Sequence, residues 1–262
     1  MTEEEKKPAR ETMDFGTNFR FKCHPGVTCF TNCCADVTIF LTPYDVARLK
    51  NRLGISSVEF MEKYTHQLTR EGQILPLVVL KMSDNDQKTC PFVTAEGCTV
   101  YEDRPWACRM YPLGMAVPPA RAGVEPEAIY FLFEDDFCEG HGEQTPWTAR
   151  DWRADQGIRE HEELEKGYRE LVSHPWFIGG RQLDPRRMEM FHTACYDLDK
   201  FRRFLFESSF LERFKLEPGL VEQIRTDDIA LLRFAFRWLR YALFAEPTMT
   251  ARPEASSTQR KA

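Results

Sequence analysis

The sequence predicts an α+β protein, mainly α, in which an irregular cysteine-rich lobe with a short β hairpin packs on a C-terminal helical bundle. Eight of the nine cysteines fall within residues 15–145, together with short runs typical of strands. Residues 146–245 carry apolar side chains at steps of three and four, which is the period of an α-helix. Twenty Phe, five Trp and eight Tyr provide enough apolar surface for a core without cross-links.

Four segments are expected along the chain. Residues 1–14 are charged and poor in large apolar side chains, and residues 246–262 are rich in Pro, Ser, Thr and Arg. Both are predicted to be disordered tails because neither has a core-forming pattern. Between them we expect a cysteine-cluster domain over 15–145 and a helical domain over 146–245.

Two short helices are predicted in the first domain. Thr42 suits an N-cap position and Pro43 the first helical position, and Gly54 ends the apolar period that follows them. A second short helix is expected over 56–64. Extended segments are predicted over 38–41, 75–80 and 128–133, and the last two are expected to pair with each other.

The second domain is predicted to contain three long helices. The first spans about 148–174 and ends before Pro175. The next begins behind Asp184 and keeps one apolar face as far as Leu205. The last covers about 226–244 and is apolar except for one narrow solvent-facing stripe of arginines, which comprises Arg233, Arg237 and Arg240.

Charge and hydropathy exclude several function classes. The net charge is −6 and no basic stretch is dense enough to follow a phosphate backbone, so nucleic acid is not an expected partner. No secretory signal opens the sequence, and no apolar run is long enough to span a membrane. A cytoplasmic protein is expected, and in that reducing compartment cysteine-dense segments bind metal more often than they form disulfides.

The first four cysteines lie within twelve residues on a loop bent by Pro25 and Gly26. A bent loop can turn neighbouring thiols toward one centre, whereas a helix or strand points them apart. The other four follow at longer intervals. The predicted metal ligands are Cys23, Cys29, Cys33, Cys34, Cys90, Cys98, Cys108 and Cys138.

Eight thiolates are two sets of four, the usual number for one iron–sulfur cluster or one structural zinc. Spacing leaves open whether they form two sites or one site with spare thiols. The chain lacks the paired C-x2-C knuckles of a zinc ribbon and the spacing of ferredoxins. An iron–sulfur cluster, for example of the [4Fe–4S] type, is the favoured cofactor, with zinc or mononuclear iron as the alternatives.

Six polar residues near these cysteines are candidates for contacts beside the ligands or for substrate binding. Their side chains can offset thiolate charge, shield the site from water or, for the histidines, replace a ligand. The alternative is ordinary structure, with a local Asp103–Arg104 salt bridge, core aromatics and surface histidines. Cys195 falls on an apolar helix face and is expected to be a buried structural thiol. The six candidates are His24, Tyr101, Arg104, Arg109, Tyr111 and His141.

Four motifs follow one another in residues 20–141: the Cys33-Cys34 pair, C-P-F at Cys90, the long motif from Gly97 to Pro112, and F-C at Cys138. In these motifs the chain resembles the YkgJ-type cysteine-cluster proteins, described as zinc- or iron-chelating and often labelled iron–sulfur proteins or Fe–S oxidoreductases. The intervals of five and three residues before Cys33 are wider than the family's usual ones. The resemblance implies metal binding by the eight cysteines.

Three functions remain open from the sequence. The first is an iron–sulfur protein with a redox or electron-transfer role and a protein or redox partner. The second is a zinc- or iron-chelating structural or binding module. The third follows from a related family, the flagellin lysine N-methylases, and is an S-adenosylmethionine-dependent protein methyltransferase, although the sequence has no G-x-G-x-G cofactor loop. No catalytic residue is predicted.

Overall fold

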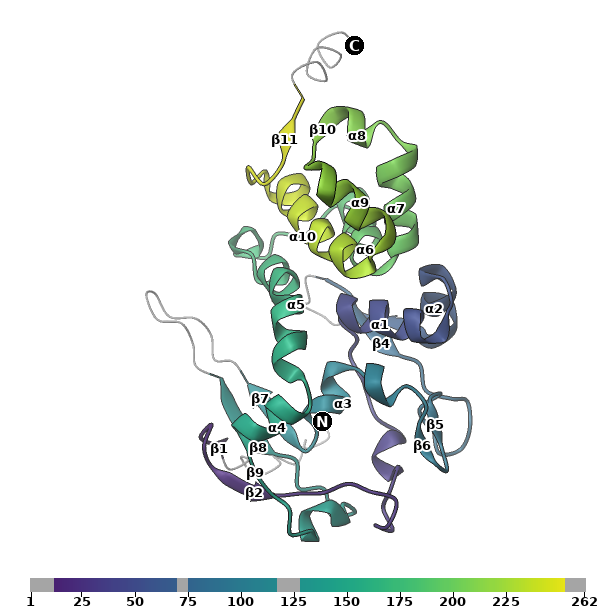
Figure 1. Ribbon diagram of the computed structural model, residues 1–262, viewed down its shortest axis with the longest axis vertical. Helices are drawn as coiled ribbons and strands as arrows, with labels where there is room; N and C mark the ends of the chain where they lie inside the picture. Colours follow the sequence, from purple (N-terminus) through teal and green to yellow (C-terminus); the bar gives the residue numbers. More distant parts are fainter. Residues whose placement is uncertain (1–11, 70–74, 117–127, 253–262) are drawn as a thin grey trace, which may run out of the picture.

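The computed structural model describes residues 12–69, 75–116 and 128–252, and the α+β, mainly α, class is confirmed there (Figure 1). The elements of the cysteine-rich part are short. They are β1 (Thr12–Met13), β2 (Asn18–Arg20), α1 (Pro43–Leu53), α2 (Ser57–Tyr64), β3 (Thr65–Leu68), β4 (Leu77–Leu80), β5 (Val93–Thr94), β6 (Gly97–Cys98), α3 (Trp106–Met110), β7 (Leu113–Ala116) and β8 (Ile129–Leu132).

Helices dominate the remaining residues. These elements are β9 (Pro146–Thr148), α4 (Ala149–Asp155), α5 (Ile158–Val172), α6 (Pro185–Tyr196), α7 (Leu198–Glu207), α8 (Phe210–Arg213), β10 (Phe214–Lys215), α9 (Pro218–Thr226), α10 (Asp228–Phe244) and β11 (Thr250–Ala251). In Figure 1 helices α6 to α10 gather at one end of the molecule, and α5 runs from them toward the sheets of the cysteine-rich part.

The two predicted helices near residue 50 are confirmed. Thr42 and Asp45 form a reciprocal capping box at the start of α1, and Gly54 takes the left-handed conformation at its end. Ser56 caps α2 by accepting the Glu59 amide.

The predicted strands near 75–80 and 128–133 are present, but their expected pairing with each other is wrong. β4 pairs antiparallel with β3, and β8 lies between β1 and β7 in a three-stranded sheet. Strand β3 has the mixed sequence Thr65-His66-Gln67-Leu68, which carries little strand signal. The residues at 38–41 are extended and make a single bridge from Phe40 to Val79.

The helical half is divided more finely than predicted. The expected helix over 148–174 is two helices, because Gly157 takes a positive φ of 65° between α4 and α5 and turns the chain. The expected long helix after Asp184 is also two, since the Asp197 side chain caps a new helix, α7, by accepting the Lys200 amide. Helix α9 precedes α10 without having been predicted.

The buried apolar residues form two clusters. The larger combines side chains of α1, α2 and β4 with those of α6, α7 and α10, and Cys195 is fully buried in it as predicted. The smaller packs Phe19 and Phe21 on Met110 and Trp152. Each cluster contains residues from both sides of position 145. The predicted boundary between two domains at that position stays a prediction.

The C-terminal segment is ordered further than predicted. Residues 246–252 lie in the described part, where β11 pairs with β10 and Met249 is buried. Two arginines of the α10 stripe hold this segment instead of facing solvent alone. Arg237 donates to the Thr248 carbonyl at 2.8 Å, and Arg240 pairs with Glu246. The predicted tail over 1–14 lies outside the described residues except for 12–14, and no described helix is both long and apolar enough to cross a membrane.

Replacement of Gly167 by Ala should destabilise the protein by roughly 1–3 kcal/mol, because a Cβ at this position of α5 would lie 2.8 Å from the Phe236 ring of α10. Gly219→Ala in α9 is the matched control, since a Cβ there meets nothing within 4 Å. That control should be neutral or stabilising, by up to about 1 kcal/mol, from helix propensity. Equilibrium denaturant unfolding measures both, and equal behaviour of the two variants would contradict the close packing of α5 on α10.

Candidate metal centre

The first four cysteines lie on a coiled loop between β2 and α1. Consecutive turns shape this loop, with the Val27 amide bonded to the His24 carbonyl, Phe30 to Val27, and Asn32 to Cys29, at 2.9–3.1 Å. A short 3₁₀ turn over Asn32–Cys34 follows. The repeated turns keep the four thiols within a small region although the loop has no strand or α-helix.

Backbone contacts bring the later cysteines to this loop. The Cys90 amide donates to the Cys34 carbonyl at 2.7 Å, and β5 and β6 form a tight hairpin that ends at Cys98. Gly97 has a φ of 123°, and a Cβ there would stand 3.3 Å from the Phe30 ring, so glycine permits both the turn and the close approach of the first loop. Cys108 follows on α3.

The electrostatic contacts among the thiols fall into two sets. Burial and then repulsion from Cys33, Cys29 and Cys138 raise the pKa of Cys23 to about 11. We call these four cysteines the first thiol group.

A second set surrounds Cys108. Burial first, and then the neighbouring Cys90, Asp45, Cys98 and Cys33, raise the pKa of the Cys108 thiol far above its usual value. The pKa of Cys34 is raised by its hydrogen bond to Cys33, by burial and by repulsion from Cys33, Cys90 and Cys108. Cys34, Cys90, Cys98 and Cys108 are the second thiol group.

The two groups meet at the adjacent pair Cys33 and Cys34. Their side chains share a hydrogen bond, and this bond lowers the pKa of Cys33 to about 7 while it raises that of Cys34. Within residues 12–69, 75–116 and 128–252, however, no three His, Cys, Asp or Glu side chains are placed so that they could hold a metal ion. The thiols are neighbours in two sets, and their sulfurs do not form closed coordination shells.

Several backbone amides donate to these sulfurs. The Glu139 amide lies 3.2 Å from the Cys29 Sγ. Burial raises the pKa of Cys90 and of Cys98, but hydrogen bonds from the amides of Phe92 and Val100 oppose that rise. Amide donors favour the thiolate form, which is the form that binds metal. The chemistry of this donor set therefore fits a thiolate-bound metal.

The two candidate histidines are engaged by the protein itself. His24 accepts the Gly26 amide on Nδ1 at 3.1 Å, and its Nε2 lies 3.5 Å from the Glu143 carboxylate. His141 Nε2 lies 2.9 Å from the Phe133 carbonyl oxygen. These contacts suit residues that support the loops around Cys23 and Cys138.

Arg109 is held by backbone carbonyls. Its Nε donates to Arg104 O and its Nη1 to Gln156 O, both at 3.0 Å, and its Nη2 donates to Glu102 O. The side chain is buried, and its donors join the turn before α3 to the turn between α4 and α5 rather than facing a ligand.

Arg104 and the two tyrosines differ in their surroundings. The guanidinium of Arg104 lies 3.8 Å above the Tyr101 ring, and its charge opposes the rise that burial causes in the pKa of Cys98. Tyr101 is 54% exposed and does not shield the thiols. The Tyr111 hydroxyl donates to Asp135 Oδ2 at 3.4 Å, and burial first and then the neighbouring Cys138 raise the pKa of Tyr111, which places this residue beside the first thiol group.

The alternative Asp103–Arg104 salt bridge is not what the structure shows. Asp103 pairs instead with Arg48 of α1, whose Nη2 lies 2.7 Å from its carboxylate. The second nearby cation is Arg52, at 4.0 Å. Asp103 thus joins the turn before α3 to α1. A local salt bridge between Asp103 and Arg104 would not have connected these two elements.

A buried polar cluster beside the second thiol group was not predicted. Asp45, His161 and Glu165 are 1%, 1% and 6% exposed. Asp45 accepts the amides of Thr42 and Trp106, and Glu165 accepts the Thr42 hydroxyl at 2.5 Å. The spacing of four between His161 and Glu165 on a charged helix was the available signal, but the same spacing is typical of solvent-facing residues.

Burial dominates the titration of this cluster. It raises the pKa of Asp45 to about 6 and, with repulsion from Asp45, that of Glu165 to about 8. Burial and then the charges of Arg109 and Arg48 lower the pKa of His161 to about 3. At neutral pH the cluster therefore contains a protonated Glu165 and a neutral imidazole.

The comparisons with known proteins identify the cysteine region. Residues 22–139, just under half of the chain, match the model of a cysteine-cluster family described as "putative zinc- or iron-chelating domain". The matched span contains both thiol groups and supports a metal-binding cysteine cluster. No curated protein and no solved structure matches the chain significantly.

The free energy of unfolding should fall between pH 6.5 and 8 because of Glu165. Its folded pKa of about 8 lies above its ordinary value of 4.5, so the folded state keeps a proton that the unfolded chain has released. His161 opposes this fall up to about pH 7.5, because its ordinary pKa of 6.5 leaves the unfolded chain partly protonated there while the folded imidazole is neutral. A Glu165 variant keeps this His161 contribution, so the comparison with wild type isolates Glu165. The slope from Glu165 is at most about 1.4 kcal/mol per pH unit.

Glu165→Gln keeps an acceptor for Thr42 and should flatten this slope, as measured by denaturant unfolding across the pH range. Glu163→Gln on the same helix is the control. Glu163 is exposed to solvent, unlike the buried Glu165, so its replacement should leave the slope unchanged. Parallel pH profiles for wild type and Glu165→Gln would contradict a protonated Glu165.

Proposed function

We propose that the eight cysteines bind metal as two four-thiolate sites, that iron–sulfur clusters are the preferred occupants, and that the protein transfers electrons. One observation carries this proposal. Beyond burial, repulsion from Cys33, Cys29 and Cys138 raises the pKa of Cys23 in the first group, and repulsion from Cys90 raises the pKa of Cys34 and of Cys108 in the second. A compensating cation would allow all four thiols of a group to ionise together.

A bound cation reverses this balance. A divalent or cluster-bound metal lowers the pKa of each thiol ligand, releases its proton and converts mutual repulsion into coordination. Because the ligands come from distant parts of the sequence, the free energy of metal binding also stabilises the loops that carry them. Closure of each site requires the sulfurs to converge, and rotation about the Cys side-chain bonds with small loop movements is the proposed route.

The surroundings suit a redox centre. An iron–sulfur cluster supplies one-electron transfer when bound, and its potential depends on charge, hydrogen bonds to sulfur and exposure to water. Amide donors to Cys90 and Cys98 and the charge of Arg104 oppose the rise that burial causes in the pKa of these two thiols, and a further amide, that of Glu139, lies 3.2 Å from the Cys29 sulfur. The aromatic ring of Tyr111, packed on Phe21 and Phe133, limits access of water on the side of Cys138.

Electron transfer also requires a partner. Phe137, next to Cys138, is 48% exposed and offers apolar contact area beside the first thiol group. We therefore place the docking of a protein redox partner at this side of the protein, where the distance to a bound centre is short.

The second candidate is a zinc- or iron-chelating module in which metal serves structure. It is favoured by the description of the matched family and by the position of Cys108 on α3, which the bond from the Trp106 amide to Asp45 joins to α1. Methyl transfer to a lysine stays a prediction from resemblance, since none of the contacts among the described residues favours it.

Metal analysis distinguishes the first two candidates. Protein purified without oxygen should contain iron and acid-labile sulfide and absorb visible light at about 400 nm, with bleaching on reduction. A colourless protein with stoichiometric zinc would contradict the redox proposal and support the chelating module.

Single Cys→Ser variants test the division into two groups. Cys138→Ser should remove metal from the first group and Cys98→Ser from the second, so each should retain about half of the wild-type metal, and the double variant none. Cys195→Ser is the matched control, because Cys195 is fully buried in the helical core and its replacement should not change metal content. Complete metal loss in either single variant would show one shared site, and full retention would remove that cysteine from the ligand set.

A further inference from the structure

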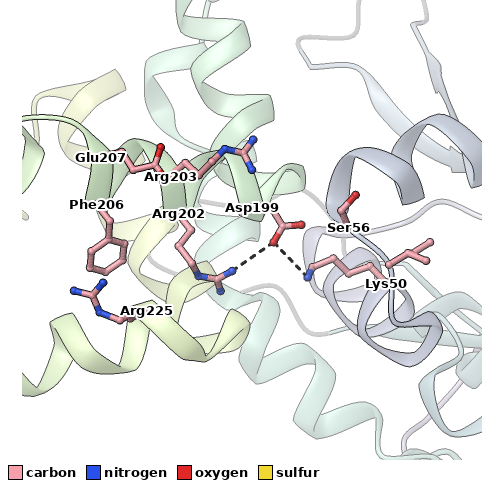
Figure 2. A pocket seen from close by; sticks show the side chains of 9 residues that line it. Lys50, Ser56, Asp199, Arg202, Arg203, Phe206, Glu207 and Arg225 are labelled. Carbon is pink, nitrogen blue, oxygen red and sulfur yellow. Dashed lines mark hydrogen bonds and ion pairs between the residues drawn. The ribbon is translucent and has the colours of Figure 1, made fainter.

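A cavity of about 560 Å³ that is open to solvent lies away from the thiols, with α1 and the link to α2 on one side and α7 and α9 on the other (Figure 2). Its volume is within the usual range for small-molecule sites, and junctions between two structural units are common places for such sites. The lining is rich in cations, with Lys50, Arg202, Arg203 and Arg225 facing only two carboxylates, Asp199 and Glu207.

The floor of the cavity is a neutral network. Lys50 Nζ lies 2.7 Å from Asp228 and 3.9 Å from Asp199, and Arg202 pairs with the same two carboxylates. Asp199 also accepts the Ser57 amide at 2.7 Å. Figure 2 shows Lys50 and Arg202 reaching Asp199 from opposite sides. This network holds the floor in place, and its two carboxylates neutralise the charges of Lys50 and Arg202.

The other two cations are available at the rim. No ion pair to Arg203 is present within the part of the chain that the structure describes, and Figure 2 shows its guanidinium directed away from Glu207. Arg225 has a single long contact, 3.8 Å to Glu222, and both of those side chains are more than half exposed. Such a surface pair contributes little and can be exchanged for a better anion.

Arg225 is also oriented by an aromatic ring. Its guanidinium carbon lies 4.1 Å from the Phe206 ring centroid, a cation–π contact that restricts the guanidinium. A guanidinium edge binds a phosphate or carboxylate through two parallel hydrogen bonds. The uncovered part of Phe206 provides an apolar wall for the remainder of a ligand.

We infer that this cavity binds a small organic oxyanion, with Arg225 as the principal contact of the acidic group, Arg203 as a second cation and Phe206 as the wall for a planar or apolar body. The shared chemistry is an oxyanion on an organic ring. Its source is either a phosphate monoester or a carboxylate. This inference is independent of the thiol groups and goes beyond the metal-binding function.

The test is calorimetric titration of the full chain with four probes, which are adenosine monophosphate, benzoate, inorganic phosphate and uncharged adenosine. We expect the nucleotide or benzoate to bind at least tenfold more tightly than inorganic phosphate, with affinity falling at high salt, and adenosine not to bind. The better of the two ring-bearing probes identifies the source of the oxyanion. No binding by either, or equal binding of inorganic phosphate, would overturn the inference.

Two variants locate the site. Arg225→Gln should weaken binding of the preferred probe at least tenfold, and Phe206→Leu should remove its advantage over inorganic phosphate. Arg213→Gln, an exposed arginine on α8 that does not line the cavity, should bind as wild type does. Thermal unfolding of each variant without probe shows whether it is folded, and unchanged affinity in a folded Arg225→Gln variant would overturn the assignment. Cys98→Ser should keep the affinity, which separates this result from metal binding.

Discussion

The carboxylate of Asp45 is the interaction on which the arrangement of the cysteine region depends most. It accepts one amide from Thr42 at the start of α1 and another from Trp106 at the start of α3, so a single buried side chain caps two helices. Cys108 lies on the second of these helices. Its position relative to the core is thus set by a hydrogen bond from α1, and loss of that acceptor would leave a buried amide without a partner.

Burial of charge decides how the surrounding groups behave. Arg109 satisfies its donors with carbonyls, so it fixes the backbone around α3 without meeting a carboxylate directly. Burial, and after it the charges of Arg109 and Arg48, lowers the pKa of His161 and favours its neutral form, and burial, and after it repulsion from Asp45, raises the pKa of Glu165. The same constraint applies to Cys23, Cys34 and Cys108, whose pKa values are raised by burial and by neighbouring thiols.

The sequence predicted features that depend on neighbouring residues. Thr42, Pro43 and Gly54 identified α1 because caps act within one turn, and the density of cysteines identified the metal region because ligands are chemically distinctive. It did not predict that β4 pairs with β3, since short strands with mixed sequences carry little register information. The division of the thiols into two groups could not be predicted either, because a hydrogen bond such as that from Cys90 to Cys34 joins distant segments.

Helix α1 links these features through three polar side chains that point to different parts of the protein. Asp45 holds α3, Arg48 holds Asp103 in the turn before α3, and Lys50 joins Asp228 at the start of α10. The apolar residues of the same helix, including Leu49, are buried in the larger core. A rigid helix with buried contacts in all three directions cannot shift at one end alone, so the loop region that carries the thiols and the helical bundle share one common support. The bundle thereby does more than cover the cysteine region: it fixes the helix against which the second thiol group is assembled.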